Sequence, residues 1–286
     1  MFLLNRYSLA EELSRRGYQV IGCSPSQAIF GQKPLEEKYG VISIPLDITN
    51  VENIKQVHDK VKEITDGKLS ILYNNAGISI AAPAIENDEE QLDRLFQINV
   101  LGHINMTKWF APFVIASKGT IIFTCSVASR VPLSWVSAYN ATKAAIDAYA
   151  QTLHGEMKPF GVRVHSVITG GVDTAICDAN VRTSLGDSYY EVPGVYDSIR
   201  ASAMMSRDLN ISPEKYAKEV VKDLMKWRDP GFNLYHGARS YFLHWVSRYL
   251  PLWLVEMGVQ WHFKQLRVLR TLAKLTKQKR YTKRNI

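Results

Sequence analysis

The chain has 286 residues, of which 46% are hydrophobic and 22% are charged. This length and composition fit one large folded domain with a substantial core and exclude a disordered chain. The net charge of +8 is uneven, because nine lysines and arginines and no acidic residue lie between Lys264 and Arg284. The remainder is close to neutral, which gives a nucleic-acid-binding function little support.

The cysteines and histidines of the chain show no metal-binding pattern. Cys23, Cys125 and Cys177 lie far apart without a CxxC pair, and the seven histidines lack metal-ligand spacing. We therefore expect no disulfide framework and no metal site, and we expect a reducing compartment.

Short apolar runs alternate with helical patterns along the chain. Continuous apolar strands separated by helices indicate a parallel sheet covered on both faces, which is a Rossmann-type, doubly wound α/β fold. Ser212 and Pro213 have the residue types expected at the cap and first position of a helix. The predicted strands are residues 18–23, 41–45, 69–73, 120–124, 162–168 and 232–235, and the predicted helices include 8–16, 51–64, 88–110, 138–158 and 212–227.

Residues 1–239 are predicted to form this domain, with a substrate lid at residues 178–209. The lid segment has no clear periodicity and is rich in Ser, Tyr and Met. A long irregular insert in a compact α/β domain is often a functional loop.

The segment SAYNATK places Tyr139 and Lys143 four residues apart at the start of a predicted helix, so their side chains share one face. An ammonium near a phenol stabilises the phenolate and lowers the pKa of the tyrosine from about 10 toward neutrality. Such a tyrosine can exchange a proton with a carbonyl or alcohol oxygen. The spacing is also common on solvated helices, but Ser126 lies just past the strand TIIFT, at the sheet edge where α/β proteins place their sites. Its hydroxyl is able to polarise the same carbonyl.

Four motifs in order resemble the short-chain dehydrogenase/reductase family: LYNNAG, INVLG, GTIIFTCSVAS and SAYNATK. The resemblance runs from about residue 7 to residue 174. It implies that Tyr139 is the general acid of carbonyl reduction, that Ser126 orients the substrate oxygen, and that Lys143 lowers the tyrosine pKa and holds the nicotinamide ribose. It also implies that Asn99 supports a water that passes protons to Lys143.

A nicotinamide cofactor follows from the same resemblance, although Thr169-Gly170 stands where the family usually has Pro-Gly. The segment CSPSQ, after the first predicted strand, holds no Asp or Glu for the ribose hydroxyl of NAD, and no Arg of the kind common in NADP enzymes. Because Ser24 and Ser26 can hydrogen-bond a 2′-phosphate, we expect NADPH. The expected cofactor contacts are Ser24, Asp47, Asn75, Ala76, Gly77, Lys108, Tyr139, Lys143, Val172 and Thr174.

Within the family, LHGEMKPFGVRV and VITGGV resemble a fungal branch that reduces 1-acyldihydroxyacetone phosphate to lysophosphatidic acid. The resemblance therefore implies reduction of a lipid ketone in glycerolipid synthesis. Hydroxysteroid, retinol and ketosphinganine reductases share the catalytic block, so a reductase of another lipophilic carbonyl, with its C-terminal segment closing the substrate pocket, is the alternative. A non-catalytic binding or scaffolding relative is a third hypothesis, against which the intact catalytic residues argue.

Residues 240–286 form a hydrophobic and then basic C-terminal segment. No uncharged apolar run in it reaches the ~18–20 residues of a spanning helix. Leucines at positions 266, 269, 272 and 275 alternate with basic residues, a pattern typical of a helix in the membrane interface, the alternative being a helix packed on the domain or on a second copy. As partners we expect a lipid substrate and a membrane or lipid-droplet surface, at the cytosolic face of the endoplasmic reticulum, and leave formation of a homo-oligomer open.

The family places a strand and a TGxxxGxG turn before the helix that here begins near Tyr7, and no glycine precedes Gly17. That strand is central in the family's sheet order, 3-2-1-4-5-6-7, so its neighbours would lose ladder hydrogen bonds. We therefore expect a sheet that lacks the usual first strand. We also expect an N-terminally truncated chain that binds NADPH poorly and is unstable.

Overall fold

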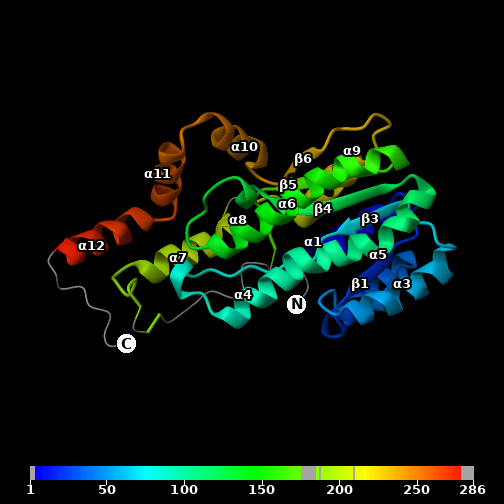
Figure 1. Cartoon of the computed structure of the whole chain (residues 1–286), viewed down its shortest axis with the longest axis horizontal. Helices are drawn as coiled ribbons and strands as arrows, with labels where there is room; N and C mark the ends of the chain where they lie inside the picture. Colours follow the sequence, from blue (N-terminus) through cyan, green and yellow to red (C-terminus); the bar gives the residue numbers. More distant parts are fainter. Residues whose placement is uncertain (1–3, 175–184, 187, 209, 278–286) are drawn as a thin grey trace.

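A computed structural model describes residues 4–174, 185–186, 188–208 and 210–277. Its strands lie at the centre and its helices cover them on both faces (Figure 1). The strands are β1 (Ile21–Ser24), β2 (Ile42–Pro45), β3 (Ile71–Asn74), β4 (Thr120–Ser126), β5 (Arg163–Thr169) and β6 (Asn233–His236). The helices are α1 (Leu4–Arg15), α2 (Lys33–Tyr39), α3 (Val51–Thr65), α4 (Glu89–Phe96), α5 (Gly102–Ser117), α6 (Ser137–Met157), α7 (Val195–Ala203), α8 (Met205–Asp208), α9 (Pro213–Leu224), α10 (Ser240–Tyr249), α11 (Leu252–His262) and α12 (Gln265–Lys277).

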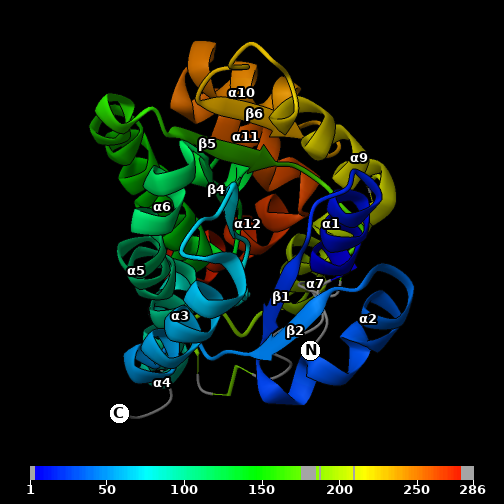
Figure 2. The ribbon, with the colours of Figure 1, turned by 90° about the vertical axis from the view of Figure 1, so that its right-hand side faces the viewer.

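The strands form two parallel sheets, and every predicted strand is present near its predicted position. One sheet holds β1 and β2, and the other has the order β3-β4-β5-β6. Among the described residues no ladder joins β1 to β3, and Figure 2 shows the two sheets as separate ribbons. This interruption lies at the position predicted for the missing strand.

Alternation along β4 explains why both faces of the larger sheet are covered. Ile121 and Phe123 are fully buried in a cluster with residues of α3, α5 and α6. Ile122, between them in the sequence, is fully buried in a second cluster with residues of α1 and α9. Successive side chains of a strand point to opposite faces, so this apolar run requires helices on both sides.

The helices differ from the predicted ones in several places, and α7 and α8 lie in the predicted lid, a segment without clear periodicity in the sequence. The predicted helix 88–110 is interrupted by a π-helical turn at Gln97–Leu101, which separates α4 from α5. A 3-10 turn (Ser26–Gln32) and α2 fill a segment for which we predict no helix. The Ser212 cap is confirmed, because its hydroxyl accepts a hydrogen bond from the backbone N–H of Lys215 at 3.3 Å.

The C-terminal helices α10, α11 and α12 pack against the domain at one end of the molecule (Figure 1). Val255, Phe263 and Val268 of this segment are buried in a hydrophobic cluster that also contains residues of α7. Leu272 and Leu275 of α12 pack against this cluster. Leu272 and Leu275 are half-buried there, so part of the leucine face of α12 lies on the domain, and the predicted place of that face in a membrane interface stays a prediction. Within the described part of the chain, no helix combines the length and apolarity needed to cross a membrane.

The chain leaves β5 and β6 through two turns that touch each other, and Gly170 makes this contact possible. A Cβ atom built on Gly170 would lie 2.1 Å from the carbonyl oxygen of Ala238. The Gly170 N–H also donates to the His236 carbonyl at 2.8 Å, and the Gly171 N–H donates to Ala238 at 3.0 Å. Only a residue without a side chain fits at this close approach of two backbones.

We predict that Gly170→Ala lowers the free energy of unfolding by roughly 2–3 kcal/mol, because a backbone clash forces the two turns apart. Gly155→Ala is the matched control, because a Cβ at this exposed position of α6 meets nothing within 4 Å. Removing a glycine from a helix interior should stabilise by about 0.5–1 kcal/mol. Urea unfolding measures both variants, and equal stability of the two would contradict the close approach at Gly170.

Candidate active site

Three of the four side chains predicted to be catalytic line one cavity at the carboxyl edge of the larger sheet, and the fourth, Asn99, lies outside its lining. Ser126 ends β4, while Tyr139 and Lys143 lie in the first two turns of α6. The sequence brings them together because a β-strand ends and the helix that follows it begins at the same sheet edge. This is the place where α/β folds put their ligands.

Lys143 is the buried cation of the site, with a side chain that is only 3% exposed. Its Nζ donates a hydrogen bond to the carbonyl oxygen of Thr124 at 2.8 Å and lies 5.8 Å from the centre of the Tyr139 ring. A buried ammonium stabilises the negative charge of a phenolate that forms nearby, because little water screens the two groups. The geometry thus supports the proton-transfer role predicted for Tyr139.

Asn99 is fully buried in the π-helical turn and fixes the elements around Lys143. Its Oδ1 accepts from the N–H of Ile78 at 2.9 Å, and its Nδ2 donates to the Ile78 carbonyl at 2.9 Å and to Thr142 Oγ1 at 3.1 Å. A π-turn inside a helix often marks a functional site. Here it joins the loop after β3 to the residue next to Lys143, while the water relay predicted for Asn99 stays a prediction.

The hydroxyl of Ser126 is oriented by one backbone hydrogen bond. Its Oγ accepts a hydrogen bond from the Ala128 N–H at 3.1 Å. A serine hydroxyl that accepts in this way retains its own hydrogen as a donor. That donor is suited to a carbonyl oxygen placed in the cavity.

Other titratable groups near the cavity are poor proton donors at neutral pH. Burial raises the pKa of the Cys125 thiol to about 12 and that of Tyr216 to about 12. Burial likewise raises the pKa of Tyr73 well above its usual value. These groups stay protonated at neutral pH, whereas Tyr139 is a phenol that lies beside the Lys143 ammonium.

Residues at the nicotinamide end of the predicted cofactor site line the same cavity. Asn75, Gly77, Val172 and Thr174 all contribute to its walls. Asn75 is held by Thr124, whose Oγ1 donates to Asn75 Oδ1 at 2.6 Å. A Cβ on Gly77 would lie 3.7 Å from Lys143 Nζ and 3.5 Å from Asn99 Oδ1, so a side chain there would reach the catalytic residues. Small residues and polar groups in this cradle fit a nicotinamide ribose.

Four predicted cofactor contacts lie outside the cavity lining. Ser24 is buried and accepts a hydrogen bond from Gln32 Nε2 at 2.9 Å, and Asp47 is exposed with its Oδ1 accepting from Thr49. Ala76 uses its carbonyl to contact His103 Nε2 at 2.8 Å. Lys108 is exposed on α5. Ser24 and Asp47 stand at the carboxyl edge of the β1–β2 sheet, so they would meet a different part of a long cofactor.

For the substrate side of the cavity the sequence predicts a lid at residues 178–209 but no individual lining residue. Leu133 and Val136, from the loop before α6, form one wall, and Ser202, Ala203 and Met205 form the other. The last three lie inside the predicted lid 178–209, whose residues 178–184, 187 and 209 are outside the described residues. In the structure Ser202 and Ala203 lie on α7 and Met205 on α8, two short helices that the sequence pattern does not predict.

A serine, a tyrosine and a lysine around one cavity of a Rossmann-type sheet define a dehydrogenase or reductase. The model of the short chain dehydrogenase family matches residues 7–184. The chain is 38% identical to an NADPH-dependent 1-acyldihydroxyacetone phosphate reductase of Saccharomyces cerevisiae, covering 96% of this chain and 92% of that protein. A protein of the same description from Schizosaccharomyces pombe is 39% identical, covering 59% of this chain and 56% of that protein.

A solved short-chain dehydrogenase from Streptomyces avermitilis has the same fold, with a TM-score of 0.70 and 23% identity, covering 96% of this chain and 93% of that one. The chain belongs to the short chain dehydrogenase family. The family resemblance inferred from the four motifs is thereby confirmed. Among the described residues no three His, Cys, Asp or Glu side chains gather in a way that would hold a metal ion.

We predict that Tyr139→Phe lowers the turnover number about a hundredfold to ten-thousandfold, because it removes the transferable proton and leaves the ring. Tyr149→Phe is the matched control on the same helix, where the half-buried ring packs edge-on against Phe123. Turnover should fall in the first variant only, and both should bind NADPH as the wild type does. Near-normal turnover by Tyr139→Phe would show that Tyr139 is not the proton donor.

Proposed function

We propose that the chain is an NADPH-dependent reductase that converts a lipid ketone to a secondary alcohol. The substrate is 1-acyldihydroxyacetone phosphate and the product is 1-acylglycerol 3-phosphate. The observation that carries the proposal is the single cavity that joins Ser126, Tyr139 and Lys143 to an apolar wall of Leu133, Val136 and Met205. The similarity to the two yeast reductases supports the choice of lipid and of cofactor.

The reduction needs a hydride and a proton, and the residues of the chain account for the proton. NADPH, when bound, supplies the hydride to the carbonyl carbon. The Ser126 hydroxyl donates a hydrogen bond to the carbonyl oxygen and orients it. Tyr139 gives its phenolic proton to that oxygen as negative charge develops there, and the Lys143 ammonium stabilises the phenolate that remains.

The apolar wall favours this substrate class over small ketones. A dihydroxyacetone unit alone would leave Leu133, Val136 and Met205 in contact with water. An acyl chain buries them, and each buried methylene contributes about 0.8 kcal/mol. The same wall would also accept a steroid or a ketosphinganine, which is the alternative reading of the site.

The test measures NADPH oxidation with acylated dihydroxyacetone phosphate, unacylated dihydroxyacetone phosphate, ketosphinganine and a steroid ketone. We predict that the acylated phosphate has a kcat/KM at least a hundredfold above its unacylated parent, because several methylenes become buried. A higher kcat/KM for the steroid or for ketosphinganine would establish the alternative. No turnover of any member of the panel would refute a reductase.

We further propose that the chain works at the surface of the endoplasmic reticulum or of a lipid droplet. Two exposed stripes support this. On α10, Tyr241, Trp245 and Tyr249 follow one another at intervals of four residues, with the last two rings stacked at 4.9 Å. On α11, Trp253 and Trp261 are 62% and 75% exposed. An apolar stripe at this spacing lies on one side of a helix and suits the headgroup boundary of a bilayer.

Charge in the same segment favours an anionic lipid surface over a second protein copy. Basic residues of α12 are exposed, and their helix contains no acid. Each basic residue near an anionic membrane contributes about 1 kcal/mol, whereas two copies of such a segment would repel each other. The exposed basic residues are Arg267, Arg270, Lys274 and Lys277.

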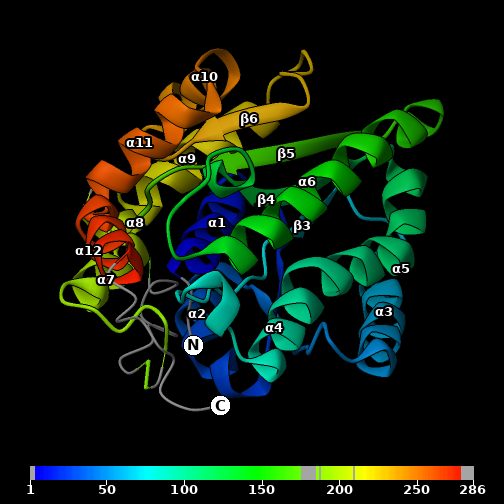
Figure 3. The same ribbon diagram turned by 60° about the vertical axis from the view of Figure 1, so that its left-hand side comes forward.

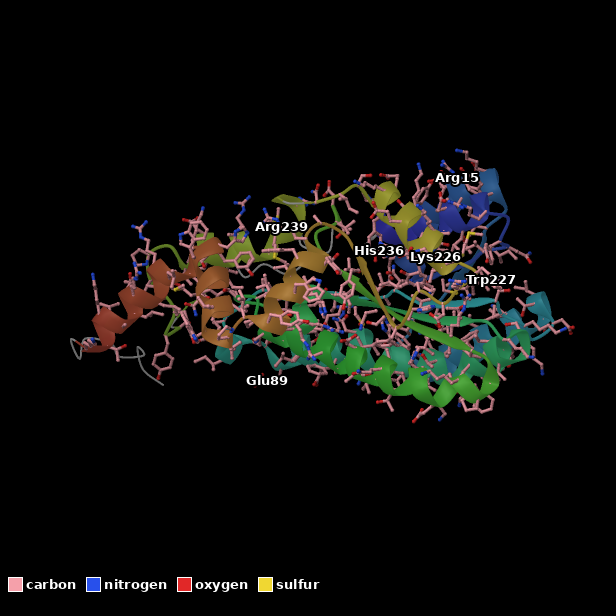
Figure 4. The ribbon with its side chains drawn as sticks, turned by 90° about the horizontal axis from the view of Figure 1, so that it is seen from above. Arg15, Glu89, Lys226, Trp227, His236 and Arg239 are labelled. Carbon is pink, nitrogen blue, oxygen red and sulfur yellow. The ribbon has the colours of Figure 1, made fainter. Side chains whose placement is uncertain are left out.

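Point variants test this better than removal of residues 240–286, which would also remove Val255, Phe263 and Val268 from the core. We predict that Trp253→Gln with Trp261→Gln lowers binding to vesicles containing phosphatidylserine at least tenfold, because two large rings no longer enter the lipid. Co-flotation measures the bound fraction. Trp227→Gln is the control, since Trp227 is 93% exposed and lies at the end of the molecule opposite to α12 (Figure 4).

Wild-type binding should weaken in high salt without vanishing, because burial of the aromatic rings is not screened. Unchanged vesicle binding by the double variant would contradict the proposal. A wild-type dimer in light scattering that the double variant converts to a monomer would instead make this face an interface between two copies.

A further inference from the structure

The C-terminal helices pack behind two elements that line the cavity, α7 and the loop before α6. Val255, Phe263 and Val268 are buried in one cluster with Val195 and Ile199 of α7. Figure 3 shows α12 lying beside α7, and residues of the two helices are in contact. The C-terminal segment is therefore continuous with the domain that carries the catalytic residues.

A chain of buried hydrogen bonds ties three distant segments together at Ser198. The indole N–H of Trp135 donates to Ser198 Oγ at 2.7 Å, and the Ser198 hydroxyl donates to the Phe263 carbonyl at 2.6 Å. Ser198 is fully buried and Trp135 is 7% exposed. The Ser198 hydroxyl thus both accepts and donates, and a buried donor or acceptor that loses its partner is costly.

Ser134 makes a second link between the same three segments. Its hydroxyl donates to Gln265 Oε1, at the start of α12, at 2.6 Å. Its carbonyl accepts a hydrogen bond from the hydroxyl of Ser202 on α7. The loop before α6 is thus bonded to α7 and to the C-terminal segment at two successive residues.

These links lie directly behind the cavity. Leu133 and Val136 of the loop line it, and Ser134 and Trp135 between them make the outer contacts. On α7, Ser202 lines the cavity, and Ser198 lies one helical turn before it. Both substrate walls are therefore held in place from behind by the C-terminal segment.

We propose that Ser198 is a positioning residue that holds α7 closed over the substrate, and that Gln265 and the Phe263 carbonyl make the C-terminal segment part of the substrate-binding site. Ser198 does not line the cavity, so it acts through Ser202, Ala203 and Met205. The consequence for substrate binding rests on the proposed reductase function. The cofactor cradle of Asn75, Gly77 and Lys143 lies on other elements and is not held by these bonds.

The first experiment compares two variants of the full chain with matched controls. Ser198→Ala removes the central hydroxyl, and Gln265→Leu removes the acceptor of Ser134. Gln265→Glu keeps an acceptor oxygen at the same place. Thr271→Ala is a control on α12, because its hydroxyl donates to the Arg267 carbonyl within the helix.

We expect Ser198→Ala and Gln265→Leu to raise KM for the lipid ketone about tenfold, the order of one lost buried hydrogen bond. The turnover number should stay within about threefold, and the Kd of NADPH should not change. Gln265→Glu and Thr271→Ala should behave as the wild type. A fall in kcat with unchanged KM, or the same loss in Gln265→Glu, would overturn the positioning role.

The hydrogen bonds of Ser198 and Ser134 that join the loop before α6, α7 and the C-terminal segment form a clamp. Amide hydrogen exchange tests this clamp without any turnover, so a wrong substrate assignment does not conceal the result. In Ser198→Ala and Gln265→Leu we expect faster exchange in α7 and in residues 131–136, with β4 and α6 unchanged. Unchanged exchange in α7 would refute the clamp even if the reductase is active. Faster exchange throughout the chain would show a general loss of stability and would refute it as well.

Discussion

The site depends on one buried charge, the Lys143 ammonium. Removing an ammonium from water is costly unless polar groups replace the water, so the surrounding elements must supply them. The carboxyl end of β4 supplies a carbonyl oxygen at Thr124, and the same residue uses its hydroxyl to hold Asn75. Gly77, in the loop after β3, lies close to the ammonium, and Asn99 of the π-helical turn holds the neighbouring Ile78 and Thr142. The cation therefore organises the cofactor side and the reacting phenol together.

The substrate side is built on a different principle. Leu133, Val136 and Met205 make its lining largely apolar. Hydroxyl, indole and amide groups behind the lining are paired with one another or with backbone carbonyls. Trp135 and Ser198 can be buried because their polar groups are paired. The desolvation penalty of an unpaired buried polar group is larger than the net stabilisation from one hydrogen bond.

Sequence patterns predicted the strands and the placement of Tyr139 beside Lys143, because both have short-range signals. Apolar runs mark the strands, and Tyr139 and Lys143 are separated by one helical turn. The clamp could not be predicted from the sequence. Trp135 and Phe263 each lie more than sixty residues from Ser198, and a single serine produces no periodic pattern that would indicate its partners. The leucine spacing of α12 predicted an apolar face, but periodicity cannot say whether lipid or protein covers it. The hydroxyl of Ser24 was likewise recognised as a hydrogen-bonding group, while its partner, Gln32, follows only from the fold.

The same helices carry the exposed aromatic stripe and the clamp, and this couples the two proposals. Trp261 is exposed, and Phe263, two residues later, is buried and accepts the bond from Ser198. If a lipid surface orders α11, it also orders the Phe263 carbonyl, which holds α7 through Ser198. Binding at the surface then favours the position of α7 that closes the substrate side of the cavity. Linkage requires the reverse with the same free energy: a substrate that closes the walls must tighten binding of the chain to the surface. A lipid substrate would then help to hold its own enzyme at the membrane from which it came.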